Sequence, residues 1–293
     1  MLPRQGLTAQ LIWISLFQME QNFIHTTLGR TNLRVHRLGL SATYRPGQKA
    51  IHKALDEGVN YFFWFNIDHQ LIRVLRDVIK TDRERYVIST GAYNLVYGHP
   101  NLRRTLEKRL RTLRTDYIDV FLFLGVLKER EFSQKTMDEL HRFREEGKVR
   151  FVGLSTHNRK FAGKLAAEGA VDVLMIRYNA SHRGAEQDIF PLLERFDPGV
   201  VSYTATSWSY LLRRPRGWPK DQPLPTAGQC YRFVLSNPHV HVCLQAPRNE
   251  KQLTENLAAL RQGPLSPEEM EFMKKFGAVI YKKKERFFSV LAR

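Results

Sequence analysis

The sequence predicts a single (β/α)8 barrel, a TIM barrel, with one extra helix at its C-terminus. Short apolar segments alternate eight times with amphipathic helical segments. The short segments are apolar on both faces and rich in β-branched residues, which is typical of the buried strands of a parallel sheet. A length of 293 residues with 43% hydrophobic residues suits one domain of this kind. A doubly wound α/β sheet is the alternative, but no glycine-rich phosphate loop follows the first predicted strand.

Each predicted strand is followed along the chain by its own helix. The strand and helix pairs are 34–42 with 46–58, 59–64 with 69–81, 85–90 with 100–114, 116–124 with 133–148, 149–155 with 158–169, 171–179 with 185–196, 199–205 with 229–237, and 239–246 with 249–263. A Pro-rich segment, 213–228, separates the seventh strand from its helix. Ser133 is expected to cap one helix, and Gly147 to end it. The extra helix, 266–287, opens with a Ser266 cap and acidic residues in its first turn.

The N-terminal residues 1–26 are expected to form an extension to a barrel that spans residues 27–293. The first 18 residues contain a short apolar stretch without a small-residue cleavage site, so we expect a true start near Met19 or a short surface arm. Only two cysteines are present, which argues against a disulfide framework and favours a cytoplasmic location. No apolar run reaches the length of a membrane span.

The net charge of +17 favours anionic partners in general. The basic residues are dispersed, and the densest run, 102–114, carries leucines at helical spacing, which indicates an amphipathic helix with a solvated basic face. No aromatic residues interleave with these charges as stacking platforms for bases. We therefore expect a small molecule, such as a phosphorylated cofactor, as the ligand. A protein that binds nucleic acid or an anionic surface is the less favoured alternative.

Several segments, in order along the chain, resemble the aldo-keto reductases. They include "LGRTNLRVHRLGLSA", "LEKRLRTLRTDYIDVFLFL", "EEGKVRFVGLSTHN" and "APRNEKQLTENLAAL", and the resemblance runs from about Thr27 to Met273. It implies a barrel that binds NADP(H) and transfers hydride between nicotinamide and a carbonyl. It also implies a catalytic set of Asp, Tyr, Lys and His at the ends of the second, third and fourth strands. In that set the Tyr is the general acid, the Lys lowers the pKa of the Tyr, and the His orients the carbonyl.

The residues that match this catalytic set are of other types. They are Phe63 for the Asp, Asp68 for the Tyr, Gly91 for the Lys and Leu124 for the His. Phe63 cannot hold a lysine, and Asp68 has neither the geometry nor the protonation state of a tyrosine acid. Tyr93 is a nearby phenol, but a tyrosine at a strand end is more often a packed aromatic. We therefore predict a reductase-like protein without normal carbonyl reductase activity, which acts as a sensor or binds a partner.

The resemblance also implies which residues would bind NADP(H). They are Ser155, Tyr203, Thr204, Arg248, Asn249, Glu255 and Asn256. Thr156 and Met175 stand where the family has two carboxamide ligands, so the nicotinamide end of the site is eroded. Arg248 suits a 2′-phosphate, and Glu255 and Asn256 match adenine contacts, although both residues suit an ordinary surface helix as well. We expect NADP(H) binding to survive better than reductase chemistry.

A second polar group follows predicted strands five and six. It consists of His157, Arg177, His182 and Glu186. Strand ends converge on one mouth of a barrel, so these side chains suit acid–base chemistry or an anionic ligand. A re-purposed oxidoreductase or other enzyme with a site at the ends of strands five to seven is the alternative function. A buried Arg177 needs an acidic partner or a ligand, and Glu186 and Asp68 are the candidate partners. His157 at a helix start and Glu186 in a first turn also have ordinary structural roles open to them. The spacing does not predict a metal site.

Overall fold

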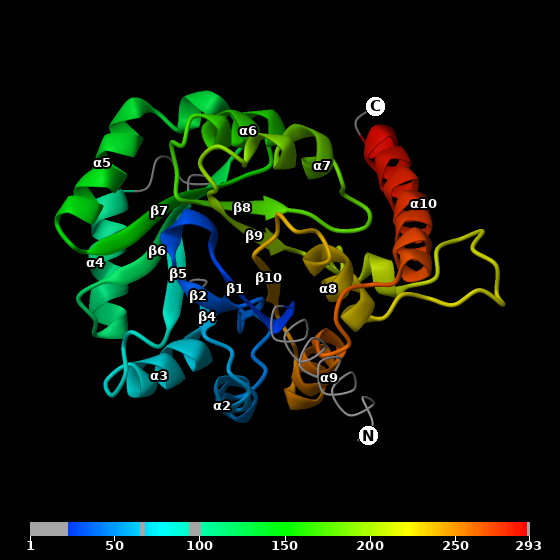
Figure 1. The fold of residues 1–293 in the computed structure, drawn as a ribbon, viewed down its shortest axis with the longest axis horizontal. Helices are drawn as coiled ribbons and strands as arrows, with labels where there is room; N and C mark the ends of the chain where they lie inside the picture. The colour runs from blue at the N-terminus through cyan, green and yellow to red at the C-terminus, as the bar shows by residue number, and fades with distance from the viewer. Residues whose placement is uncertain (1–22, 65–67, 94–100, 292–293) are drawn as a thin grey trace, which may run out of the picture.

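The structure, a computed structural model, describes residues 23–64, 68–93 and 101–291, with side chains up to residue 282. It confirms the predicted barrel, because eight parallel strands close into one sheet from β3 to β10, and β10 pairs with β3 (Figure 1). The barrel strands are β3 (Leu38–Leu40), β4 (Tyr61–Phe63), β5 (Val87–Tyr93), β6 (Ile118–Val126), β7 (Val149–Thr156), β8 (Val173–Arg177), β9 (Gly199–Tyr203) and β10 (Val242–Gln245).

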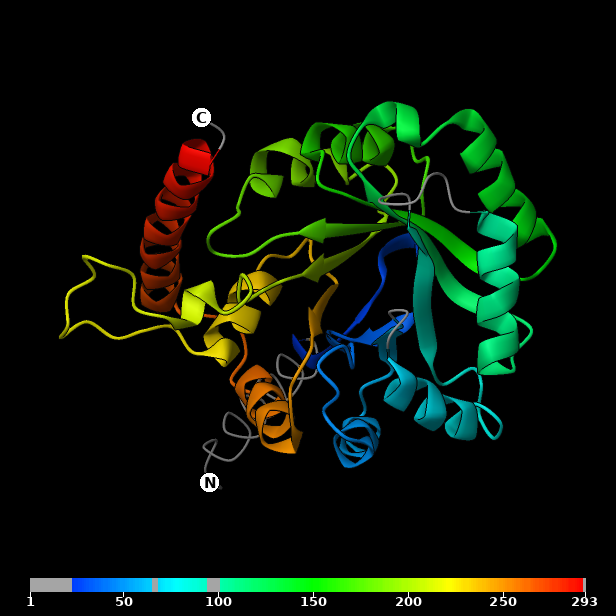
Figure 2. The same cartoon turned by 180° about the vertical axis from the view of Figure 1, so that it is seen from behind.

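Helices surround this barrel, and the view from behind shows the same ring (Figure 2). The helices are α2 (Gln48–Asp56), α3 (His69–Val78), α4 (Leu102–Leu113), α5 (Gln134–Glu145), α6 (Arg159–Ala167), α7 (Ala185–Asp188), α8 (Ala227–Leu235), α9 (Glu250–Leu260) and α10 (Pro267–Leu291). Short 3-10 turns are η1 (Gly29–Thr31), η2 (Glu129–Glu131), η3 (Phe190–Leu192) and η4 (Tyr210–Leu212). The extra helix α10 packs on α8 and η4. Within the described residues, no helix has the length and apolar character needed to cross a membrane.

The aromatic run on β4 shows how the strand period divides the core into two parts. Tyr61 and Phe63 belong to the cluster inside the barrel, whereas Phe62 and Trp64 belong to the cluster between the strands and the helices. Successive side chains of a strand point to opposite faces, so one run of large rings fills both spaces. The guanidinium of Arg109 on α4 stacks on Trp64, 4.4 Å from its ring centroid. Burying each ring stabilises the folded state by roughly 1.5–3 kcal/mol relative to leaving it exposed to water.

Two of the predicted elements are wrong in detail. Segment 34–42 is divided into β2 (Arg34–His36), which forms an antiparallel hairpin with β1 (His25–Thr27), and the barrel strand β3. The predicted strand is interrupted at Arg37. The guanidinium of Arg37 donates to the carbonyls of Leu235 and Val240 at 2.8 Å. The predicted helix 185–196 is only the short α7 followed by η3, because Pro191 lacks the N–H that a continuous helix needs.

The β1–β2 hairpin covers the bottom of the barrel, where the strands begin. Leu28, Leu33 and Val35 from this region join the cluster inside the barrel. In the described part of the predicted extension 1–26, Phe23 is buried in the cluster between the strands and the helices, and β1 pairs with β2. The expected start near Met19 lies outside the described residues.

Two buried carboxylates organise the same bottom end. Asp119 is fully buried and accepts from Arg83 at 2.7 Å, from Arg150 at 3.0 Å and from the Ile88 amide at 2.9 Å. Asp172 pairs in the same way with Arg30 at 2.9 Å and with Arg144 at 3.4 Å. It also accepts from the Val152 amide at 3.0 Å. Each carboxylate thus ties neighbouring strands to two guanidinium groups.

Candidate functional site

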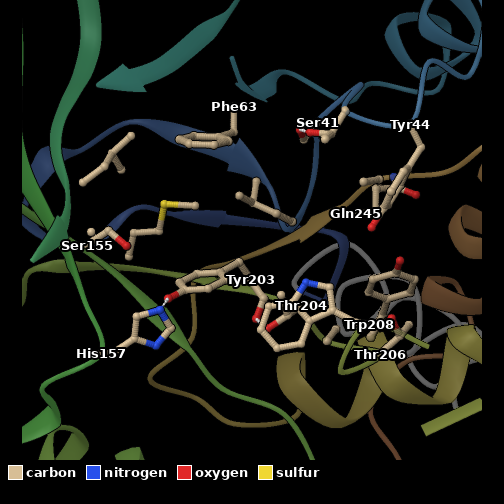
Figure 3. A pocket seen from close by; sticks show the side chains of 18 of the residues that line it. Ser41, Tyr44, Phe63, Ser155, His157, Tyr203, Thr204, Thr206, Trp208 and Gln245 are labelled. Atoms are coloured by element: carbon tan, nitrogen blue, oxygen red, sulfur yellow. Dashed lines mark hydrogen bonds between the residues drawn. The ribbon is translucent and has the colours of Figure 1, made fainter. Parts of the chain in front are cut away.

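The opposite end of the barrel, where the strands end, holds a cavity of about 370 Å³ (Figure 3). Every barrel strand contributes to its wall through its last residues or the loop that follows. The lining residues are Ser41, Thr43, Tyr44, Phe63, Tyr93, Leu124, Gly125, Ser155, His157, Met175, Tyr203, Thr204, Ala205, Thr206, Trp208, Tyr231, Leu244, Gln245 and Ala246. Barrels of this architecture carry their active sites at this end. An apolar cavity with a few convergent polar groups is the usual form of a small-molecule site.

The floor of the cavity is apolar. Phe63, Leu124, Met175 and Leu244 close it from below, and all four belong to the cluster inside the barrel. Phe63 and Leu124 occupy positions that the resemblance assigned to a catalytic Asp and His. At these two positions the wall offers no group that donates or accepts a proton.

Asp68 and Gly91, the other two positions of that set, do not line the cavity. Asp68 is buried before α3 and accepts a long hydrogen bond from Ser41 Oγ at 3.4 Å. Gly91 packs so closely on β6 that a Cβ there would lie 2.0 Å from the Leu122 carbonyl oxygen. Backbone atoms cannot yield as a flexible side chain would, so position 91 has no room for a lysine.

The polar wall of the cavity centres on Tyr203. Its hydroxyl lies 3.5 Å from His157 Nε2, and the two rings meet edge to face with centroids 6.2 Å apart (Figure 3). Burial raises the pKa of the Tyr203 phenol, against a smaller opposing effect of its hydrogen bond with Ser155. Burial, and then the nearby Arg177, lower the pKa of His157. At neutral pH the pair is therefore a protonated phenol beside a neutral imidazole.

The loop after β9 is strained where it borders the cavity. Thr204, Ser207, Trp208 and Ser209 all have positive φ angles, between 51° and 66°. This left-handed region costs a non-glycine residue about 1–2 kcal/mol. Asn179 holds the loop by donating to the Thr204 carbonyl at 2.8 Å. Strain of this kind clusters at ligand sites, where the surrounding structure fixes it.

Of the seven residues predicted to bind a dinucleotide, three line the cavity and four lie on α9 or just before it. Ser155, Tyr203 and Thr204 line it directly. Asn249 caps α9 by accepting from the Gln252 amide at 2.9 Å, which is an ordinary structural role. Glu255 is exposed and lies 3.9 Å from Lys251 on the same helix.

The α9 side reaches the cavity through Tyr44 and Gln245, two residues that were not predicted from the sequence. Arg248 stacks on Tyr44, with the guanidinium 5.3 Å from the ring centroid, and Tyr44 lines the cavity. Asn256 is buried and donates to Gln245 Oε1 at 3.0 Å. The Gln245 Nε2 atom is buried and makes no hydrogen bond to the residues that the structure describes. A glutamine at the end of the apolar strand "VCLQ" was the signal for this position.

The second predicted group is only partly brought together. His157, Arg177 and His182 line one small cavity of about 20 Å³, and His157 also lines the main cavity. Glu186 does not join them, because it accepts from the Tyr178 hydroxyl at 2.8 Å. An acidic partner or a ligand was expected for Arg177. Within the described part of the chain, neither Glu186 nor Asp68 forms an ion pair with Arg177.

Comparison with known proteins identifies relatives of the sequence. Residues 40–216 match the Aldo/keto reductase family. The uncharacterized oxidoreductase YqkF of Bacillus subtilis (strain 168) is 21% identical over 287 residues, covering 83% of this chain and 93% of that protein. The probable aldo-keto reductase 1 of Glycine max is 24% identical over 185 residues, covering 57% of this chain and 53% of that protein.

Solved structures share the fold. The holo form of aldo-keto reductase AKR11C1 from Bacillus halodurans superimposes with a TM-score of 0.72 at 20% identity, covering 86% of this chain and 95% of that one. An aldo/keto reductase from Klebsiella pneumoniae, solved in complex with NADP and acetate, gives a TM-score of 0.70 at 21% identity, covering 87% and 95%. At this identity the likeness establishes the architecture.

Proposed function

The chain belongs to the aldo/keto reductase family, and from that premise we propose that it binds NADP(H) at the barrel mouth without normal carbonyl reductase activity. One observation carries the proposal. A single cavity joins Ser155, Tyr203 and Thr204 on one side to Tyr44 on the other, and Arg248 stacks on Tyr44. The Klebsiella relative was solved with NADP, which supports a dinucleotide as the ligand.

The residues present fit such a ligand. The Tyr203 ring offers a face for a planar heterocycle, and an offset stack of that kind is favourable. The buried Gln245 Nε2 offers a hydrogen-bond donor beside the cavity. The Arg248 guanidinium suits the two oxygens of a 2′-phosphate. These three groups would bind and orient the ligand, whereas the nicotinamide would supply hydride chemistry when bound.

The same wall argues against carbonyl reduction by the family's route. A proton must reach the carbonyl oxygen as hydride arrives, and a positioned acid normally supplies it. Phe63 and Leu124 supply none, and position 91 has no space for the lysine that lowers the pKa of a tyrosine acid. A protein with this wall would hold the nucleotide and act as a sensor or bind a partner.

A re-purposed enzyme is the second candidate, and the Tyr203–His157 contact favours it. A protonated phenol 3.5 Å from a neutral imidazole forms a pair that can pass a proton between a ligand and solvent. In that case Tyr203→Phe would abolish a turnover that Phe63→Leu leaves intact.

Titration with NADPH, NADP⁺ and NADH by calorimetry tests the leading proposal. We expect NADPH to bind at least about tenfold tighter than NADH, because Arg248 adds charged hydrogen bonds to the 2′-phosphate. Arg248→Met should remove this preference. Arg142→Met, an exposed arginine of α5, is the matched control and should keep it.

Steady turnover of NADPH with simple aldehydes would contradict the proposed loss of activity. Absence of binding by all three nucleotides would contradict the cofactor site.

A further inference from the structure

A small positively charged cavity lies beside the main one. Arg177, His157, His182 and Arg159 contribute to its lining, and no lining residue is acidic. Its volume of about 20 Å³ leaves room for about one water-sized group. A site of this size suits the end of a ligand, such as a carboxylate, and excludes a whole sugar or ring.

Strand geometry places Arg177 at the mouth of the barrel. Val173 and Met175 on β8 face the barrel interior, and Arg177 continues the same face two residues further on. It pairs in register with Tyr203 on β9, the residue at the centre of the polar wall. Arg177 therefore lies next to the main cavity, although it lines only the smaller one.

The Arg177 guanidinium is partly buried and makes no hydrogen bond or ion pair with any residue in the described ranges. The nearby acids are engaged elsewhere. Asp188 binds Arg159 at 2.6 Å, and Glu186 accepts from Tyr178. A guanidinium stays charged in proteins, so its partial desolvation is uncompensated within this part of the chain.

We propose that Arg177 binds the carboxylate of a ligand whose apolar or aromatic body lies in the main cavity. A carboxylate matches the planar fork of a guanidinium, which can donate two parallel hydrogen bonds. His157 lines both cavities, so the two sites share one wall. The apolar floor and the rings of Tyr44, Tyr93 and Trp208 provide the surface for the body.

This inference deepens the proposed function by naming the class of compound that the cavity accepts beside the nucleotide. Arg177 is a specificity-determining residue in this scheme. The nucleotide and the carboxylate would use different groups, so the two claims can fail separately.

The test uses 3-phenylpropionate and its neutral analogue 3-phenylpropionamide as probes of the full chain, with and without NADPH. Calorimetry or ligand-observed NMR measures the affinities. We expect the wild type to bind the carboxylate at least about tenfold tighter than the amide, because charged hydrogen bonds are the strong ones. Arg177→Met should lower the carboxylate affinity to that of the amide, and Arg177→Lys should keep part of the difference. Arg142→Met should change neither.

Equal affinity for the two probes in the wild type overturns the proposal, as does an Arg177→Met variant that keeps the preference. Circular dichroism checks the fold of each variant, and Arg177→Lys decides the question if Arg177→Met does not fold.

Acetate should bind at least about tenfold more weakly than 3-phenylpropionate, since it lacks the apolar body. Equal binding of acetate overturns the placement of the body. Carboxylate binding without NADPH binding would contradict the proposed cofactor site alone, and the reverse result would contradict this inference alone.

Discussion

The two ends of the barrel balance charge in opposite ways. At the bottom, Asp119 and Asp172 are each paired with two arginines and a backbone amide. At the mouth, Arg177 has no acidic partner in the described residues, and Gln245 carries a buried amide nitrogen without a hydrogen bond. The two buried carboxylates at the bottom are thus fully paired, although the buried Arg37 Nε there has no hydrogen bond to a described residue. The mouth holds the unpaired Arg177 and the Gln245 amide nitrogen, and it also contains the strained loop after β9.

We infer that the polar groups at the bottom of the barrel stabilise the fold, whereas those at the mouth serve to bind a ligand. Removing one partner of a buried ion pair is costly, because the other charge stays buried and unpaired. A protein that needs only to fold gains nothing from polar groups left without partners. Arg177 and the Gln245 amide nitrogen border cavities at the mouth, where a ligand has room to supply the missing partners.

The largest effect is expected at the bottom, from Asp119→Ala. The change leaves the guanidinium groups of Arg83 and Arg150 without their shared carboxylate, and it should lower the free energy of unfolding by about 3–5 kcal/mol. Urea denaturation measures it. Asp77→Ala, which removes the partner of an exposed Lys80, is the control and should change little. If Asp119→Ala lowered the free energy of unfolding as little as the control does, the bottom of the barrel would not be the end that stabilises the fold.

The next effect tests how tightly β5 and β6 pack below the mouth. Gly91→Ala should lower the free energy of unfolding by about 3 kcal/mol. The Cβ of the new alanine would press on the Leu122 carbonyl oxygen and force the two strands apart. Thermal and urea denaturation measure the cost. Gly147→Ala is the control, since a Cβ there meets nothing within 4 Å and only its φ of +70° opposes the change. Wild-type stability of Gly91→Ala would show that this position can accept a side chain, a lysine included.

A smaller effect concerns protons at the bottom. His36 is buried and accepts from the Leu38 amide at 3.0 Å, and burial lowers its pKa to about 3. The unfolded chain binds a proton near pH 6.5, so the stability from neutral His36 is present above that pH and is lost as the pH falls towards 3.

Between pH 7 and pH 5 this histidine should account for a loss of about 2 kcal/mol. His36→Asn keeps an acceptor in place and should flatten the pH dependence by that amount in urea titrations. His52→Asn, an exposed site on α2, should leave it unchanged. If the free energy of unfolding of His36→Asn depended on pH as strongly as that of the wild type, this histidine would not be the acid-sensitive group.

The smallest effect is expected at the mouth and completes the comparison. Arg177→Met should leave the free energy of unfolding within about 0.5 kcal/mol of the wild type, or raise it, because no ion pair is lost. Arg83→Met at the bottom should lower it by at least about 2 kcal/mol, because Asp119 then loses a partner. The same denaturation curves measure both variants. A large loss from Arg177→Met would mean that this arginine supports the fold.

The sequence predicted the barrel, and it placed the apolar Phe63 and Leu124 at two positions of the catalytic set. The alternation of strands and helices is a local pattern, and the period of two on β4 already directs Phe63 inwards. The break at Arg37 and the β1–β2 hairpin were missed, because they depend on carbonyl groups supplied by α8 and its following turn, about 200 residues away. The early end of α7 could have been predicted, since Pro191 in the sequence is incompatible with a continuous helix.

By itself, the sequence determined the architecture, the family and the residue types at the mouth, because hydrophobic period and family motifs are written along the chain. Only the tertiary structure decided which of those residues meet. It turned Glu186 towards Tyr178 and left Arg177 beside His157, and it closed β6 over Gly91. Ion pairs and close packing join residues that are distant in sequence, so their partners depend on how each helix is directed and how neighbouring strands are registered.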